Sequence, residues 1–589
     1  MQHPHRINTQ LSRRNFLHVT GVGLAGLAAS SARAKQPGPT RPNVLLIMTD
    51  DQGYGDLSCH GNTVLSTPHL DRLHDQSVRL TDFHVSPTCA PTRAALMTGR
   101  YNNRTGVWHT IMGRSILRRD ERTMADYFSD AGYRTGIFGK WHLGDNYPYR
   151  PEDRGFQEVL IHGGGGVGQT PDYWGNNYTD DTYFHNGQPT PYPGYCTNVW
   201  FDGARAFMEA KPDEPFFCYL ATNISHAPYL VDESYRKPFL DQGVKPDRAA
   251  FYGMLTHFDE CMGRLLARLD ATGLSDNTIV IFMTDNGTSA GHRGGMRGAK
   301  GSEYEGGHRV PCFIRWPKGD LGGDRNIDQV TAHIDILPTL LDYCGIERDT
   351  TMPFDGISLR PWLTDENRVV PERTVVVDSQ RIDHPKKWRK SAVLEKHWRL
   401  VNGKELYDVE KDPAQKKDIA QQHQDVVKRL RDQYDVWWAS TSKHFDEYCP
   451  LVVGAADQGA MHFSCHDWHA PIAQVPWNQP HIREGKPGQG FWVIDVETAG
   501  TYTIALRRWP RETNGTIRGS VDGGKALPIT TARVQIADVS ETKPVSNTDR
   551  AVAFQVALSK GEHRLHTAFV EDDGSERGAY YISMERSRD

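Results

Sequence analysis

Two short apolar segments, each followed closely by polar residues, constrain the fold of this chain more than any other feature. The segments are residues 43–48 (NVLLIM) and 278–283 (TIVIFM). The polar residues that come after them are Asp50, Asp51, Asp285 and Asn286. Continuous apolar runs of this length are typical of parallel strands that are buried on both faces. Strand and helix patterns alternate around them, which predicts a doubly wound α/β domain.

Parallel strands place their carboxyl ends at one edge of a sheet, and ligands bind at that edge in open α/β folds. We therefore expect the four polar residues to lie together there. Their carboxylate and amide oxygens form a hard ligand set that suits calcium or magnesium. For an exported protein, we expect calcium.

Basic residues follow other predicted strands and belong at the same edge. Lys140 and His142 come after one strand pattern, and His226 comes after another. Lys300 lies in a glycine-rich run. Each of them alone would more commonly be a surface residue or a hydrogen-bonded histidine. Together with a metal ion they indicate hydrolysis of an anionic ester, in which cations hold the oxyanion and a basic side chain protonates the leaving oxygen.

The segment Cys89-Ala90-Pro91-Thr92-Arg93 predicts a helix that begins at a cysteine. Pro91 suits the first helical turn, where its missing N–H costs nothing. Arg93 follows about one turn after Cys89 and so faces the same point in space. A thiol, a helix N-terminus and a guanidinium group together make an anion site that contains a reactive atom.

The chain resembles the type I sulfatases of the alkaline phosphatase superfamily over about residues 42–440. The motifs that carry the resemblance are CAPTR at 89–93 with LMTGR at 96–100, GKWHLG at 139–144 and ELYD at 405–408. The resemblance implies an alkaline-phosphatase-like fold and hydrolysis of sulfate monoesters. It also implies that a maturation enzyme oxidises Cys89 to formylglycine (3-oxoalanine).

The resemblance further implies roles for individual residues. One calcium ion would be bound by Asp50, Asp51, Cys89 as formylglycine, Asp285 and Asn286. Sulfate binding and proton transfer would belong to Arg93, Lys140, His142, His226 and Lys300. We expect Asp285 to activate one hydroxyl of the hydrated aldehyde, and His142 to take a proton from the other. His226 or Lys300 would protonate the leaving alcohol.

Changes in patterning divide the 589 residues into four segments. We expect a signal peptide at 1–34, a catalytic α/β domain at 35–370, a small antiparallel α+β subdomain at 371–445, and a β-sandwich accessory domain at 446–589. Short strand patterns separated by turn signals predict the sandwich.

Three local expectations belong to this division. The long segment 145–196 is rich in glycine and polar residues and is expected to be loop. The subdomain is expected to end in a helix over 414–438. The sandwich is expected to include a strand at 516–521.

The N-terminus has the order of parts of a twin-arginine export signal. Arg13 and Arg14 precede the weakly apolar run 18–30, and Ala32-Arg33-Ala34 offers a cleavage site. We therefore expect a periplasmic or secreted protein. No other run is long and apolar enough for a membrane span. The expected signal peptide carries four arginines and no acidic residue, so its removal makes the mature chain more acidic than the full sequence, whose net charge is −5. This acidity argues against a nucleic-acid binder.

The identity of the substrate stays open at the level of sequence. The aromatic-rich stretch 173–183 and the appended β-domain favour a sulfated carbohydrate, since aromatic faces suit sugar rings. An aryl sulfate, a phosphodiester or a phosphonate monoester is the alternative, because related hydrolases share the Cys-x-Pro-x-Arg motif. A non-catalytic glycan-binding protein is a third hypothesis, and the intact set of site residues argues against it. Residues 465–469 (CHDWH) lack a second ligand cluster and indicate a structural role.

Overall fold

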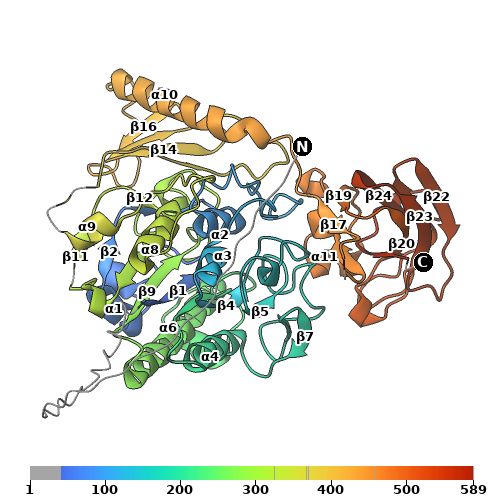
Figure 1. Ribbon diagram of the computed structural model, residues 1–589, viewed down its shortest axis with the longest axis horizontal. Helices are drawn as coiled ribbons and strands as arrows, with labels where there is room; N and C mark the ends of the chain where they lie inside the picture. The colour runs from blue at the N-terminus through green and yellow to red at the C-terminus, as the bar shows by residue number, and fades with distance from the viewer. Residues whose placement is uncertain (1–40, 324, 366–367, 369, 457, 588–589) are drawn as a thin grey trace, which may run out of the picture. The chain divides into compact units, whose positions relative to one another are not determined.

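The computed structural model describes residues 41–589 apart from 324, 366–367, 369, 457 and 588–589 (Figure 1). The predicted export signal at residues 1–34 lies outside the described residues. Within the described part of the chain, no helix has the length and apolar character needed to cross a membrane.

Among the described residues, ten strands form a mixed sheet at the centre of the larger α/β region (Figure 1). Their bounds are β1 Asn43–Thr49, β2 Val78–Leu80, β4 Arg134–Lys140, β5 Glu158–His162, β6 Thr182–His185, β7 Gln188–Pro191, β8 Phe216–Ala221, β9 Thr278–Thr284, β10 Cys312–Arg315 and β11 Arg325–Ile327. The strand order is β11-β2-β10-β9-β1-β8-β4-β5-β6-β7. The four central strands, β9, β1, β8 and β4, run parallel, so their carboxyl ends share one edge.

Strand β1 is buried on both faces, as its continuous apolar sequence predicts. Val44, Leu46 and Met48 belong to the core on one face of the sheet, and Leu45 and Ile47 to the core on the other. Helices on the first face are α2 Cys89–Thr98, α3 Met124–Asp130 and α8 Ile336–Cys344, and those on the second are α1 Pro68–Asp75, α4 Cys196–Glu209 and α6 Pro246–Thr272. Helices on both sides of a largely parallel sheet confirm the predicted doubly wound fold.

The expectation that residues 145–196 are loop was wrong. Strand β5 pairs in parallel with β4, and β6 and β7 form an antiparallel hairpin that extends the sheet. The hairpin turns at Asn186 and Gly187, which both have positive φ. Strand β7 has the sequence QPTP and is mostly exposed at the edge of the sheet. Proline and polar residues are tolerated at such an edge, and they hide the strand pattern in the sequence.

A second, antiparallel sheet carries helix α10 (Gln424–Thr441) against one face (Figure 1). Its strands are β13 Val375–Asp378, β14 Ser391–Glu395, β15 Trp398–Val401 and β16 Glu405–Asp408. The helix expected over 414–438 begins later than predicted. The Asp412 carboxylate accepts hydrogen bonds from the N–H groups of Lys416 and Lys417, and these bonds hold the segment as a turn.

The C-terminal region contains two further sheets, which confirm the appended β-sandwich. Their strands are β17 Leu451–Val453, β19 Phe491–Val496, β21 Ile529–Ile536, β22 Val539–Pro544, β24 Gly561–Glu571 and β25 Glu576–Arg577 in one sheet, and β18 Met461–Ser464, β20 Gly500–Arg507, β23 Val552–Leu558 and β26 Tyr581–Arg586 in the other. The strand expected at 516–521 does not form. Arg508 instead donates a hydrogen bond to the carbonyl of Gly519 (3.0 Å), within a bend. The predicted domain boundaries stay predictions.

Several short elements complete the description. The shorter helices are α5 Glu233–Asp241, α7 Glu305–His308, α9 Arg360–Thr364 and α11 Gln479–Glu484. Strands β3 (Phe83–His84) and β12 (Thr331–Ala332) pair in parallel. A 3₁₀ turn, η1 (Ser58–His60), lies between β1 and α1.

Candidate active site

Polar residues extend from the carboxyl ends of the central strands. Strand β1 leads to Asp50 and Asp51, and its parallel neighbour β9 leads to Asp285 and Asn286. Lys140 is the last residue of β4, which lies on the other side of β8. The side chains of Asp50, Asp285 and Lys140 are fully buried. The strand topology therefore gathers carboxylates and a lysine at one edge.

Helix α2 brings Cys89 and Arg93 to the same edge. Arg93 is fully buried, and its guanidinium donates to Asp285 Oδ2 (2.9 Å) and to the carbonyl of Lys140 (2.9 Å). The potential ligand atoms of Cys89, Asp50 and Asp285 all lie within 4.8 Å of one another. The cysteine at the start of the helix thus lies against the acidic strand ends.

Two lysines pair with the carboxylates of Asp50 and Asp51, which follow β1. Lys140 Nζ donates to Asp50 Oδ2 (2.6 Å), and Lys300 Nζ lies 2.5 Å from Asp51 Oδ1 and 2.7 Å from Oδ2. His226 Nε2 lies 4.0 Å from Asp51 Oδ2. The structure therefore gathers the predicted constellation around Asp50 and Asp51. His142 follows Lys140 by two residues, and the glycine run 163–166 lies against both its ring and that of His226.

The pKa values of Asp50 and Asp285, the two carboxyl groups next to Arg93, are shifted in opposite directions. Burial alone would raise the pKa of Asp50, but the charges of Lys140, His226 and Arg93 hold it well below its ordinary value. Burial and then the charge of Asp50 raise the pKa of Asp285 to about 7, although Arg93 opposes this. A carboxyl group that titrates near neutrality can accept and release a proton during a reaction.

His142 is fixed in one tautomer. Its Nε2 lies 2.8 Å from the carbonyl of Thr110, which can only accept, so Nε2 carries the proton. Its Nδ1 is buried and has no hydrogen-bond partner among the described residues. Burial, followed by the charge of Lys140, places the pKa of His142 well below its ordinary value, so the ring is neutral. Both His142 (φ 64°) and Asp51 (φ 62°) have left-handed backbone, which is strained for non-glycine residues.

Two buried oxygens at this edge also lack a hydrogen-bond partner among the described residues, namely Asp50 Oδ1 and Asn286 Oδ1. The amide nitrogen of Asn286 donates to Asp51 Oδ1 (2.8 Å) and to the carbonyl of Gly287 (2.9 Å), which fixes the orientation of the amide. A buried polar atom without a partner costs about 1–3 kcal/mol. Oxygens of this kind are the ligands that a hard cation prefers, so the donor set fits calcium.

Two features that lie against His142 and His226, the histidines predicted to transfer protons, were not recognised in the sequence. A Cβ added to Gly165 would lie 2.3 Å from the His142 ring, and one added to Gly166 would lie 3.3 Å from His226. The run of four glycines at 163–166 therefore lies against both rings, although its only sequence signal was its composition. From the C-terminal region, buried His466 lies with its ring centroid 6.3 Å from that of His142, and no local pattern indicated this contact.

Comparisons with known proteins agree on one family. The sulfatase family model matches residues 42–346, and the model described as N-sulphoglucosamine sulphohydrolase, C-terminal, matches residues 299–437. Arylsulfatase A of Homo sapiens is 32% identical over 58% of this chain and 70% of its own length. Steryl-sulfatase of Mus musculus is 30% identical over 57% of this chain and 67% of its own length.

A solved structure extends the similarity to three dimensions. The crystal structure of Ps i-CgsB in complex with k-i-k-neocarrahexaose has a TM-score of 0.64 and 25% identity. The match covers 69% of this chain and 95% of that one. The family matches span more than half of the chain, and the fold and the strand-end residues agree with them. The chain belongs to the sulfatase family, as a type I sulfatase of the alkaline phosphatase superfamily that hydrolyses sulfuric esters.

Proposed function

We propose that this sulfatase removes sulfate from a sulfated carbohydrate, with formylglycine at residue 89 and one bound calcium ion. The observation that carries the proposal is the pair of unpartnered buried oxygens, Asp50 Oδ1 and Asn286 Oδ1, at the sheet edge that also holds Cys89. When present, the hydrated formylglycine supplies two hydroxyl groups on one carbon, and calcium supplies a charge that polarises the ester.

The chain's own cations would bind the sulfate group. Arg93, Lys140 and Lys300 contribute three positive charges around the aspartates. Arg93 is held in position by its bonds to Asp285 and to the Lys140 carbonyl, so it needs little reorganisation to meet an anion. Preorganised charge of this kind stabilises the negative oxygens that develop around sulfur.

The tautomer of His142 and the solvent exposure of His226 and Lys300 indicate which residue accepts a proton and which donates one. His142 is neutral, and its Nδ1 has no hydrogen-bond partner among the described residues, so it can accept a proton at that atom. The side chains of His226 and Lys300 are 17% and 16% exposed, whereas those of Arg93, Lys140 and Asp285 are fully buried. The leaving alcohol, which must reach solvent, therefore belongs on the side of His226 and Lys300, and either can protonate it.

Several features support a carbohydrate substrate. A cavity of about 850 Å³ lies between the segment 144–189 and the β-sandwich, and its lining includes Tyr147, Tyr173, Arg507 and Arg511. Aromatic faces and guanidinium groups are suited to sugar rings and their anionic substituents. The similar solved structure contains a neocarrahexaose. N-acetylgalactosamine-6-sulfatase of Canis lupus familiaris is 30% identical over 58% of this chain.

An aryl sulfate is the second candidate, because arylsulfatase A is similarly related.

A sulfate-release assay tests the substrate. The chain is co-expressed with a formylglycine-generating enzyme and assayed against defined sulfated glycans and a chromogenic aryl sulfate. We expect kcat/KM to be higher for at least one glycan. A preference for the aryl sulfate over every glycan would contradict the carbohydrate assignment.

Mass spectrometry and metal removal test the chemistry. We expect the peptide that contains Cys89 to carry an aldehyde in active protein and a thiol in inactive protein. Dialysis against a chelator should abolish activity, and calcium should restore it. Full activity of protein that retains the Cys89 thiol, or of protein without bound calcium, would refute the proposed chemistry.

We also propose that the chain is exported by the twin-arginine pathway after oxidation of Cys89. This pathway moves folded proteins, and Cys89 is only 3% exposed in the folded chain, so a maturation enzyme must reach it earlier. We expect formylglycine in the cytoplasmic precursor. Its presence in exported protein together with its absence from the precursor would contradict this order.

A further inference from the structure

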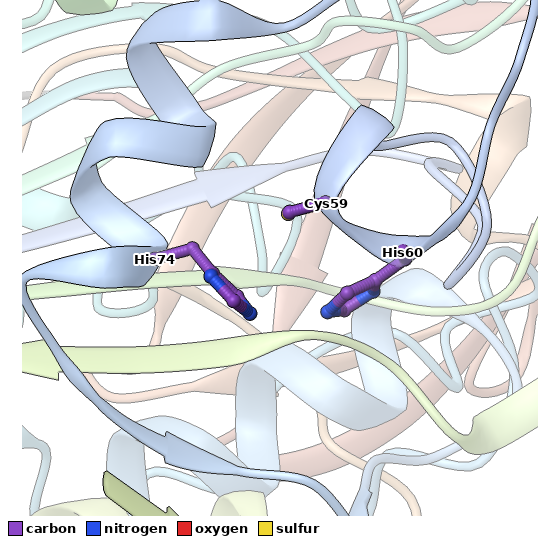
Figure 2. A group of neighbouring side chains, drawn as sticks. All are labelled: Cys59, His60 and His74. Atoms are coloured by element: carbon purple, nitrogen blue, oxygen red, sulfur yellow. The ribbon is translucent and has the colours of Figure 1, made fainter. Parts of the chain in front are cut away.

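A second cluster of potential metal ligands lies outside the active site (Figure 2). Cys59 and His60 belong to the turn η1, and His74 lies in the last turn of helix α1. One ligand atom from each of the three residues lies within 4.8 Å of the other two. In Figure 2 the tips of the two imidazole rings point toward each other, with Cys59 next to the gap.

Both rings present the same nitrogen to this gap. His60 Nδ1 lies 2.8 Å from the carbonyl of Tyr54, and His74 Nδ1 lies 2.9 Å from Asp75 Oδ1. A carbonyl and a carboxylate can only accept, so each Nδ1 carries a proton, and Nε2 is the atom of each ring that is left to bind a metal ion. Histidine ligands of metals donate their other N–H to such oxygens, which fixes the tautomer and the ring orientation.

The turn that carries Cys59 is held by the helix that carries His74. Asp71 of α1 accepts hydrogen bonds from the Cys59 N–H (3.0 Å) and from the Ser58 hydroxyl (2.6 Å). The His60 and His74 rings also pack edge-on against Phe313, with centroid distances of 5.7 and 5.2 Å. The three ligand side chains are therefore positioned by contacts that need no ion.

We propose that Cys59, His60 and His74 form a structural site for zinc or a similar transition-metal ion. One thiolate and two imidazoles suit such an ion, whereas calcium prefers oxygen. Three protein ligands leave a fourth position for water. Binding would release the thiol proton to solvent, with no change in oxidation state.

The position of this site gives it a stabilising role. It joins the segment after β1, which begins with Asp50 and Asp51, to the end of helix α1. A bound ion would replace the weak contacts across the gap with three coordinate bonds and so oppose local opening of this segment. The inference is independent of the chemistry proposed at Cys89, because it concerns other ligands and another class of ion.

Metal binding to the full chain tests the site. The protein is first loaded with calcium, then equilibrated with zinc and freed of excess metal, and its zinc content is measured. We expect about one zinc per chain and a thermal midpoint raised by about 3 °C or more. Cys59→Ser and His74→Gln should each weaken zinc binding by at least about 10-fold. His69→Gln, an exposed histidine of the same helix, is the matched control and should bind like the unmodified chain.

Cobalt provides a readout that does not depend on the variants folding well. In the unmodified chain, bound Co²⁺ should show a thiolate-to-metal charge-transfer band and the intense visible bands of a four-coordinate ion. Cys59→Ser should lose the charge-transfer band. Absence of that band in the unmodified chain, or equal zinc binding by Cys59→Ser, His74→Gln and the control, would overturn the proposal.

Discussion

The active-site edge and a cluster around Arg399 are both buried and charged, but they differ in how completely their polar atoms are used. The cluster consists of Asp82, His84, Glu305, His308 and Arg399. Three of its members lie close enough together to resemble a metal site. None of its buried side-chain nitrogens and oxygens is among the described atoms that lack a partner.

Arg399 supplies the positive charge of this cluster. Its guanidinium donates to both oxygens of Asp82 (2.8 Å each) and to Glu305 Oε1 (2.7 Å). His84 contacts Asp82 Oδ1 (3.0 Å) and the His308 ring (3.0 Å). The network joins strand β15 of the small sheet to the α/β region, and it is complete without an ion. At the active site, by contrast, Asp50 Oδ1, Asn286 Oδ1 and His142 Nδ1 have no hydrogen-bond partner in the part of the chain that the structure describes. Between these two clusters, the difference lies in the unused polar atoms and not in the buried charge.

The largest effect on activity is expected from substitution of Cys89. Cys89→Ser, when it is not itself oxidised, lacks the second hydroxyl needed to expel sulfate. We expect steady-state turnover to fall by at least about 10⁴-fold, with at most one turnover per chain. Steady-state and single-turnover assays measure this difference. Cys344→Ser, at another buried cysteine, is the control and should keep its activity. Sustained turnover by an unoxidised Cys89→Ser protein would show that residue 89 does not act in this way.

Arg399→Met tests the structural role of the Arg399 cluster. It leaves Asp82 and Glu305 buried with only the longer contacts of Arg309, at 3.7 and 3.5 Å, so we expect the free energy of unfolding to fall by about 3 kcal/mol. Calcium affinity of the folded fraction should not change. Arg429→Met, which removes a partly exposed ion pair with Glu395, should cost about 1 kcal/mol or less. Chemical denaturation measures both. A loss of calcium binding with unchanged stability would reverse the roles assigned to the two clusters.

A smaller effect is expected at Gly165. Gly165→Ala would place a methyl group 2.3 Å from the His142 ring and displace it. We expect kcat/KM to fall by about 10–100-fold, with little change in stability, because small displacements of catalytic groups are costly. A Cβ added to Gly459 would meet no described atom within 4 Å, so Gly459→Ala serves as the control. Equal kinetics for the two variants would mean that the glycines do not position His142.

The sequence predicted those features that depend on regular structure. Because parallel strands end at one edge, the apolar runs were enough to place Asp50, Asp51, Asp285 and Asn286 together. The roles of these residues rest on the family resemblance and remain predictions. Contacts that depend on loop paths could not be read in the same way. His466 lies next to His142 although more than 300 residues separate them in the sequence, and no local pattern in 465–469 predicts this contact. The pairing of Cys59 with His74 depends on the angle between a turn and a helix.

The smallest expected effect concerns pH and sharpens the assignment of the Arg399 cluster. Burial alone would raise the pKa of Glu305, but Arg399 and His84 lower it to about 2. A carboxyl group with a lowered pKa in the folded state stabilises the protein above its unfolded pKa, near 4.5, and this contribution is lost as the pH falls toward 2. The destabilisation caused by Glu305→Gln should therefore shrink by about 1 kcal/mol between about pH 4.5 and pH 3.5.

Denaturation curves at the two pH values measure this change. Glu347→Gln, at an exposed glutamate, should cause the same small change at both. If the effect of Glu305→Gln were independent of pH, Glu305 would not be held ionised by Arg399. The cluster would then resemble the active site, where burial and then the charge of Asp50 raise the pKa of Asp285 to about 7.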